Sequence, residues 1–238
     1  MKKGNDDKLP NLGVQATDHI VTVSRMGLGA VPVFGSALSE LATMIIPNQR
    51  LERVVDFAQK LHEKTKGLEE SFITSQLTDE NFVDILEEGM TQAAKSVAEK
   101  RRGYIASVIA HGLSEDQIEF METRRVLKLL SELNDNEIIL LRFYLVPTIG
   151  GDEEFRSKHE SLLKVRPATI NAQQRDVEKE AIHNSYIENL CNYGLLRKEY
   201  SVDITDKIEY DKSTQAPKIR RTVITSLGKY FLRQIGLN

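Results

Sequence analysis

The sequence lacks several features that define common classes of protein. Its single cysteine, Cys191, excludes a disulfide within the chain and a metal site built from several cysteines, and it fits a reducing compartment. Tryptophan is absent and aromatic residues make up only 6% of the 238 residues, which argues against a surface that stacks bases or sugars. The 32 basic and 35 acidic residues nearly balance, so bulk charge does not favour nucleic-acid coating.

Motifs for catalysis and for cofactor binding are also missing. The five histidines are scattered and lack the i, i+4 spacing of a zinc-binding helix. His183 lies eight positions before Cys191, a rise of about 12 Å along a helix, which is too far for a thiolate–imidazole pair. No Walker loop, dinucleotide fingerprint or GxSxG sequence is present. We therefore predict no catalytic residue, no metal site and no cofactor.

The composition, with 40% hydrophobic and 28% charged residues, is that of a folded globular protein. Residues 1–25 mix both signs of charge and lack the apolar core of an export signal, so we predict a flexible tail there. These features predict a cytoplasmic protein, with attachment to the surface of the inner membrane left open as an alternative.

Residues 26–47 form an apolar segment that carries one charged side chain, Glu40. Its first half contains three glycines and a proline, which prevent a continuous membrane-spanning helix. In its second half, polar side chains follow one helix face, at Ser36, Ser39, Glu40 and Thr43. We expect a core helix with a polar seam; insertion into a bilayer is the alternative. The candidate residues for membrane or partner contact are Val33, Phe34, Leu38, Leu41, Ile45 and Ile46.

Helical periodicity continues through residues 51–61, 82–98 and 104–112. Gly89 and Gly103 are candidate positions for a bend or a break. The basic triplet Lys100–Arg102 has two interpretations: ion pairs with nearby acids, or contact with phosphate or anionic lipid. No strand pattern of comparable strength occurs before Pro147, so residues 26–112 are predicted to form a helical domain.

The second domain is predicted to span residues 113–238. It contains a capping box at Ser114–Gln117, helices near 118–133 and 138–146, and a loop at about 148–171. The first of these helices has Ile118, Met121, Val126, Leu129, Leu130 and Leu133 as its expected buried residues. A helix through residues 177–190 follows, with Gly194 as its C-terminal cap. Alternating patterns near residues 200–204 and 219–223 predict two strands, and Thr225 caps a last helix.

The segments Tyr193–Leu196 (YGLL) and Val223–Phe231 (VITSLGKYF) give this end of the chain a clear pattern of helix, strand, loop, strand and helix. This pattern resembles a winged-helix domain. Together with the helical first half, it resembles the Abi-alpha type of bacterial abortive-infection proteins. The predicted fold is therefore mainly α, with an N-terminal helical bundle and a C-terminal winged-helix-like domain that carries a two-stranded β-hairpin. The resemblance implies a role in phage defence and transfers no catalytic residue.

A winged helix also raises the hypothesis of DNA binding, which can be judged from the numbers of acidic and basic residues in its helix and hairpin. The helix that would enter the major groove, about residues 176–193, carries more acids than bases, which opposes contact with phosphate. After Asp211 the chain has no acidic residue, and the candidate phosphate-contacting residues are Lys212, Lys218, Arg220 and Arg221. A basic hairpin that balances the acidic helix, either within the fold or across a dimer, explains the same charges equally well.

These observations predict a non-enzymatic bacterial defence or stress module that acts through contact with a protein or a membrane surface. The expected partner is another protein or a second copy of the chain, and a membrane surface is a further candidate. The alternative function is a winged-helix transcriptional regulator that binds DNA, which the charges support only weakly.

Overall fold

The computed structural model describes residues 26–114, 120–146, 151–164, 173–203, 207–211 and 215–237. The chain divides into two compact units, Met1–Arg124 and Arg125–Asn238. The tail predicted for residues 1–25 lies outside the described residues.

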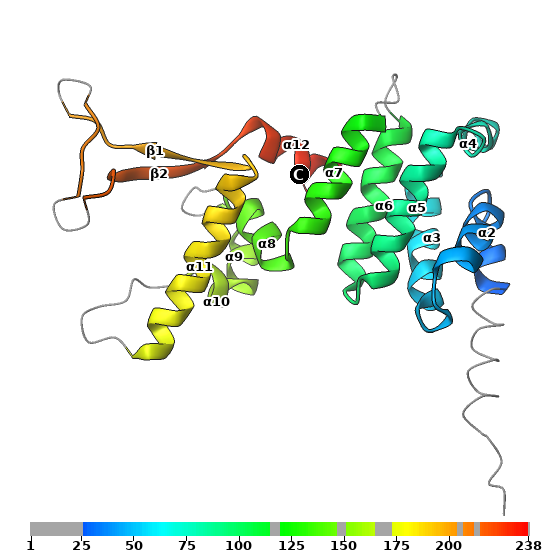
Figure 1. The fold of residues 1–238 in the computed structure, drawn as a ribbon, viewed down its shortest axis with the longest axis horizontal. Helices are drawn as coiled ribbons and strands as arrows, with labels where there is room; N and C mark the ends of the chain where they lie inside the picture. Colours follow the sequence, from blue (N-terminus) through cyan, green and yellow to red (C-terminus); the bar gives the residue numbers. More distant parts are fainter. Residues whose placement is uncertain are drawn as a thin grey trace, which may run out of the picture. The chain divides into compact units, whose positions relative to one another are not determined.

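The first unit is a bundle of helices. Its described elements are α2 (Gly35–Ile45), the 3₁₀ turn η1 (Asn48–Arg50), α3 (Leu51–Thr65), α4 (Glu70–Gln76), α5 (Glu80–Lys95) and α6 (Glu99–Ser114). Helices α3, α5 and α6 pack against one another, and α2 lies against α3 and α5 (Figure 1). The buried face of α3 repeats at helical spacing, with Leu51, Val54, Phe57, Ala58 and Leu61. This bundle confirms the predicted helical first half.

Two local features set the ends and the spacing of α5. The Asp79 side chain accepts hydrogen bonds from the backbone N–H groups of Asn81 and Phe82, at 2.8 and 3.3 Å, and so caps the helix. A Cβ atom at Gly89 would lie 2.4 Å from Cδ1 of Ile109 on α6. Gly89 therefore permits close packing of the two helices instead of breaking α5.

The helical pattern predicted through Val97 and Ala98 is wrong at its end. Helix α5 stops at Lys95, α6 begins at Glu99, and the Val97 side chain between them is 78% exposed. The physical reason is a side chain from the next helix: Arg102 Nη1 donates to the carbonyls of Ser96 and Val97, both at 3.0 Å. The guanidinium satisfies carbonyls that the end of a helix leaves without partners.

The division between the units lies within α7 (Phe120–Glu132), whereas the sequence predicts a boundary between residues 112 and 113. The first turns of α7 pack on the first unit, because Thr123 lies directly over Gly112 and Arg124 pairs with Asp84 at 2.8 Å. Met121, expected to be buried, is 78% exposed, while Val126, Leu129, Leu130 and Leu133 are buried as predicted. The predicted capping box and Ile118 lie outside the described part of the molecule.

The second unit continues with α8 (Asp135–Phe143), α9 (Glu153–Lys158), α10 (Glu160–Leu163), α11 (Gln174–Asn192), β1 (Leu196–Tyr200), β2 (Ile219–Ile224) and α12 (Ser226–Gln234). A buried carboxylate joins α8 to α11. Glu137 accepts from the backbone N–H of Asn134 at 2.7 Å, which completes a capping box, and from Nδ2 of Asn189 at 2.7 Å. One side chain thus fixes the start of α8 and its position against α11.

Strands β1 and β2 form a two-stranded antiparallel hairpin, and α12 follows it (Figure 1). This arrangement confirms the predicted fold class. At the base of the hairpin, Gly194 adopts φ +72°, the left-handed geometry predicted for a glycine cap. The Thr225 side chain caps α12 by accepting a hydrogen bond from the backbone N–H of Gly228. The backbone N–H of Thr225 donates to the Leu195 carbonyl at 3.0 Å, and its hydroxyl donates to the Gly194 carbonyl at 2.7 Å. The two segments that carry the family resemblance therefore contact each other.

The loop expected at about 148–171 contains the two short helices α9 and α10 in its described part. Arg156 holds them: it donates to the carbonyls of Val146 and Gly151, at 2.9 and 2.7 Å, and lies 4.8 Å from the centre of the Phe143 ring. Arg142 pairs with Asp152 at 2.7 Å. Polar composition predicted an irregular loop, and these contacts between arginine, aromatic and backbone groups stabilise helical turns there.

Candidate functional site

The distal part of the hairpin forms a small three-way junction of backbone. Beyond β1 and β2, Val202 pairs with Ile208 and Tyr210 pairs with Pro217 in isolated antiparallel bridges. Three hydrogen bonds close the junction: Ser201 N donates to Lys218 O at 2.8 Å, Glu209 N to Ser201 O at 2.9 Å, and Lys218 N to Glu209 O at 2.8 Å. The hairpin thus divides into two smaller arms.

One face of this junction is apolar. Residues opposite each other in an antiparallel pair share a face, and so do residues two apart along a strand. Tyr200 pairs with Ile219 across the ladder. The pairings and the alternation therefore place six side chains on one face, which we call the junction face: Tyr200, Val202, Ile208, Tyr210, Pro217 and Ile219.

The junction face is uncovered. Tyr200, Val202, Ile208, Tyr210 and Ile219 are 43%, 53%, 45%, 58% and 49% exposed, and Pro217 is also exposed. Single exposed apolar residues are ordinary, but a contiguous set on one face of a thin sheet marks a contact surface. Figure 1 shows β1 and β2 leaving the side of α8 and α11 as an arm.

The junction face lies on the α11 side of strand β1. Leu196, Lys198 and Tyr200 alternate along β1, so they point to the same side of the strand. Leu196 is buried, and the Lys198 ammonium pairs with Glu188 of α11. The register irregularity leaves Arg220 of β2 as the extra residue and leaves the alternation of β1 intact.

The opposite face of the hairpin carries several ion pairs. Glu199 accepts from Arg221 on β2 and from Arg197 at 2.8 Å, and the bond from Arg221 holds the pKa of this carboxyl below its usual value. Glu209 pairs with Lys218 at 3.5 Å. Glu199 and Glu209 thus neutralise Arg221 and Lys218, which come later in the chain.

This pairing bears on the predicted phosphate-contacting residues. Lys218, Arg220 and Arg221 are exposed, but Lys218 and Arg221 have acidic partners and Arg220 lies close enough to Glu199 to lower its pKa. Lys212 lies outside the described residues. Helix α11 exposes most of its length, with only Leu190 buried, and its acids outnumber its bases. Of the candidate bases in the described part of the hairpin, Lys218 and Arg221 therefore lie beside acids.

The apolar segment 26–47 is distributed between the core and the surface. Phe34 and Leu38 are fully buried, Val33, Leu41 and Ile46 are partly exposed, and the side chain of Ile45 lies outside the described part of the molecule. Ser36, Glu40 and Thr43 of the polar seam are exposed, and Ser39 is partly exposed. The side chains of Phe34 and Leu38 are therefore already engaged inside the first unit. Within the described ranges, none of the helices combines the length and the apolar character that a bilayer-spanning segment requires.

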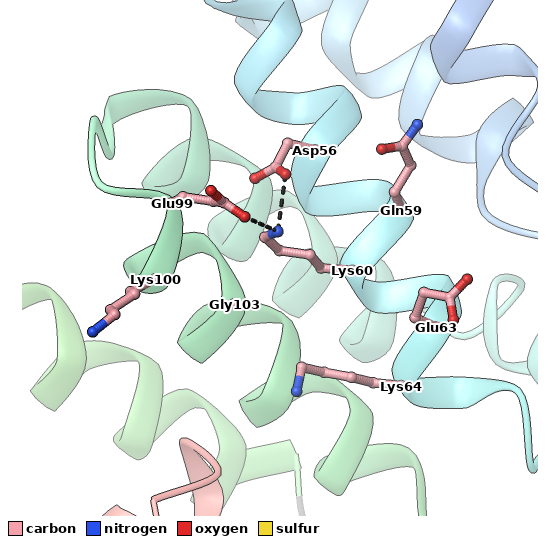
Figure 2. Close-up of a pocket in the computed structure, with 8 residues that line it drawn as sticks. All are labelled: Asp56, Gln59, Lys60, Glu63, Lys64, Glu99, Lys100 and Gly103. Carbon is pink, nitrogen blue, oxygen red and sulfur yellow. Dashed lines mark hydrogen bonds and ion pairs between the residues drawn. The ribbon is translucent and has the colours of Figure 1, made fainter. Parts of the chain in front are cut away.

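The first unit has a groove beside α3 and α6, shown in Figure 2. Lys60 sits between Asp56 and Glu99, with its ammonium 3.0 and 2.9 Å from their oxygens. The hydrogen bond to Glu99 raises the pKa of Lys60, and Arg102 binds the same aspartate. The side chains of Lys100 and Glu63 point away from this cluster. A network of ion pairs thus lines this groove. For Arg102, the structure supports the first interpretation of the basic triplet, which is an ion pair with an acidic side chain of the protein.

The reactivity of Cys191 and of the histidines can be examined only where the structure describes them. Burial raises the pKa of the Cys191 thiol, which disfavours the reactive thiolate, and burial lowers the pKa of His183. The described part of the chain holds no group of three or more His, Cys, Asp or Glu side chains able to ligate a metal ion.

The prediction from the sequence covers only half of the junction face. It identified the alternation through Tyr200 and Val202 and the strand containing Ile219, but not Ile208, Tyr210 and Pro217 as members of the same sheet. The signal was available in the alternation of Ile208 and Tyr210 with Lys207, Glu209 and Asp211. Comparison with protein-family models, curated proteins and solved structures found no match to this chain.

Proposed function

We propose that this chain is a non-enzymatic bacterial defence or stress module that acts by protein contact, and that the junction face is its contact surface. The defence role rests on the resemblance carried by Tyr193–Leu196 and Val223–Phe231. The contact role rests on one observation: six apolar side chains share an uncovered face at the end of the hairpin. The single cysteine suits work in the reducing cytoplasm.

The composition of the junction face favours a protein partner. Tyrosine supplies a large contact area with few rotatable bonds, and it is enriched among the residues that dominate binding energy. Tyr200 and Tyr210 are flanked by branched aliphatic side chains, so a partner that covers the face removes both rings from water. Five half-exposed side chains correspond to roughly 500 Å² of apolar surface, which is the size of a functional patch on a soluble protein.

The charges around the junction face argue against the other partners. Residues 201–218 contain four acids, Asp203, Asp206, Glu209 and Asp211, against three bases, Lys207, Lys212 and Lys218. A surface with this balance is not drawn to an anionic bilayer or to a phosphate backbone. The alternative function, DNA binding through the hairpin, depends in part on Lys218 and Arg221, which are paired with Glu209 and Glu199.

A phage challenge tests the proposal. Bacteria that produce the wild-type chain are expected to give fewer plaques than cells without it, and the double substitution Ile208→Ser with Tyr210→Ser is expected to abolish this protection. The matched control is Lys207→Ser, because Lys207 alternates with Ile208 and so lies on the opposite side of the same arm. Circular dichroism and protein level must be the same for all three chains. Equal protection by the double variant, or none by the wild type, would refute the proposal.

A further inference from the structure

The junction face lacks a second layer within its own arm. A two-stranded hairpin is marginally stable in water by itself, and a sheet normally buries its apolar face against another layer about 10 Å away. The ladder of β1 and β2 and the two bridged arms form a single thin sheet, and its exposed apolar side chains are not covered by the described residues of the second unit. A layer supplied by a partner would cover this face.

From this we infer that the junction face binds the same face of a second copy of the chain, related by a two-fold axis. The inference rests on the proposed function, because it assumes that the junction face is a contact surface. It adds the identity of the partner.

Charge makes a second copy a suitable partner. The junction face holds no ionised side chain, and the pairs Glu199–Arg221 and Glu209–Lys218 are on residues that alternate with those of the face. A two-fold contact places like residues near like residues, so a charged face would repel its own copy, whereas an apolar face does not. The residues flanking the face carry both signs, and the whole chain has a net charge of only −3.

The area that two junction faces would bury is also consistent with a second copy of the chain as the partner. Two copies of the junction face together remove roughly 1,000 Å² from water, which reaches the lower limit of a specific interface. An interface of this size gives a weak dimer that exchanges with the monomer. We therefore expect a dissociation constant on the order of 10 µM, and a dimer that fills as concentration rises through that value.

Sedimentation equilibrium between about 1 and 200 µM tests the inference. The wild-type mass is expected to rise from 27.0 kDa toward twice that value, and the same rise is expected for Lys207→Ser. The Ile208→Ser, Tyr210→Ser variant is expected to remain a monomer throughout, with an unchanged circular dichroism spectrum. A wild type that stays monomeric, or a variant that dimerises equally well, would overturn the inference.

A chemical cross-link locates the contact independently. In a Cys191→Ser background, Val202→Cys places a thiol on the junction face and Lys207→Cys places one on the opposite face. A bifunctional thiol reagent with a reach of about 10 Å, the spacing of packed sheets, is expected to link Val202→Cys chains into dimers and to leave Lys207→Cys chains unlinked. The reverse pattern, or equal linking, would place the dimer contact elsewhere.

The same variants separate this inference from the proposed function. If the wild type stays monomeric but the Ile208→Ser, Tyr210→Ser variant loses phage protection, the second copy is the wrong partner and the contact function stands. If the variant loses dimerisation but protects cells fully, the second-copy inference stands and the proposed function falls.

Discussion

Gly228→Ala should reverse the usual effect of a glycine-to-alanine change in a helix. Alanine normally stabilises a helix by about 1 kcal/mol relative to glycine. At Gly228, in the first turn of α12, a Cβ atom would lie 2.3 Å from the Leu195 carbonyl oxygen and 2.8 Å from Cγ1 of Ile224. Both distances are shorter than van der Waals contact, and the closer atom belongs to the backbone, which cannot rotate away.

The magnitude follows from the contacts that must shift. Forcing an extra methyl group into a packed site costs about 1–3 kcal/mol. Moving Leu195 also weakens the hydrogen bond from Thr225 N to its carbonyl, 3.0 Å long, which is worth about 1 kcal/mol. After the helix-propensity gain of about 1 kcal/mol is subtracted, the second unit should lose about 1–3 kcal/mol of unfolding free energy.

Denaturant unfolding followed by circular dichroism measures this loss. Gly103→Ala in α6 is the matched control, because its Cβ would meet nothing closer than Lys60 Cδ at 3.9 Å. The control should be neutral or stabilising by up to about 1 kcal/mol. If Gly228→Ala stabilises the protein as much as Gly103→Ala does, the close approach of α12 to the base of the hairpin is wrong.

Three further predictions concern the charged groups. Arg102→Met should destabilise the first unit by about 1–3 kcal/mol in denaturant unfolding, because it removes one of the two cationic partners of the Asp56 carboxylate and the hydrogen bonds that an 11% exposed side chain gives to two backbone carbonyls; a loss below about 0.5 kcal/mol would contradict this role. Arg221→Ala should raise the pKa of Glu199 toward 4.5 in an NMR titration, because the arginine lowers this pKa in the wild type. Any stability that the pair contributes is present above the pKa of Glu199 in the unfolded chain and is lost as the pH falls through its pKa in the folded chain. An unchanged titration of Glu199 would disprove the pairing. The wild-type protein is expected to cause no shift of a DNA duplex pool in a gel at low salt, and the double variant Arg220→Ala, Arg221→Ala should behave in the same way. A salt-sensitive shift by the wild type that the two substitutions abolish would establish the DNA-binding alternative.

Local signals account for the parts of the fold that the sequence predicted. Gly194 and Thr225 were identified because a left-handed cap and an N-cap each depend on one residue type at one position, and both have that role in the structure. The helical pattern of the first unit was similarly visible from the spacing of its apolar residues. Gly89, in contrast, is consistent with either a break or a close contact, and only the position of Ile109 on the next helix decides between them.

The features that escaped prediction depend on contacts between distant segments. The short helices α9 and α10 are held by Arg156, whose partners Val146 and Phe143 belong to an earlier part of the chain. Met121 fits a helical pattern but is exposed, because period alone does not say which turns of α7 have a neighbour. The junction face needs three ladders to close around Ser201, and no single alternating segment shows that closure.

Site-specific photo-cross-linking in phage-infected cells tests most directly whether the protein works by contact through the junction face. A photoreactive phenylalanine analogue replaces Tyr210 in one chain and Lys207, on the opposite face, in another. We expect a discrete protein adduct from position 210 and none from position 207. Adducts of equal yield from both positions, or none from position 210 in cells that are protected, would contradict it.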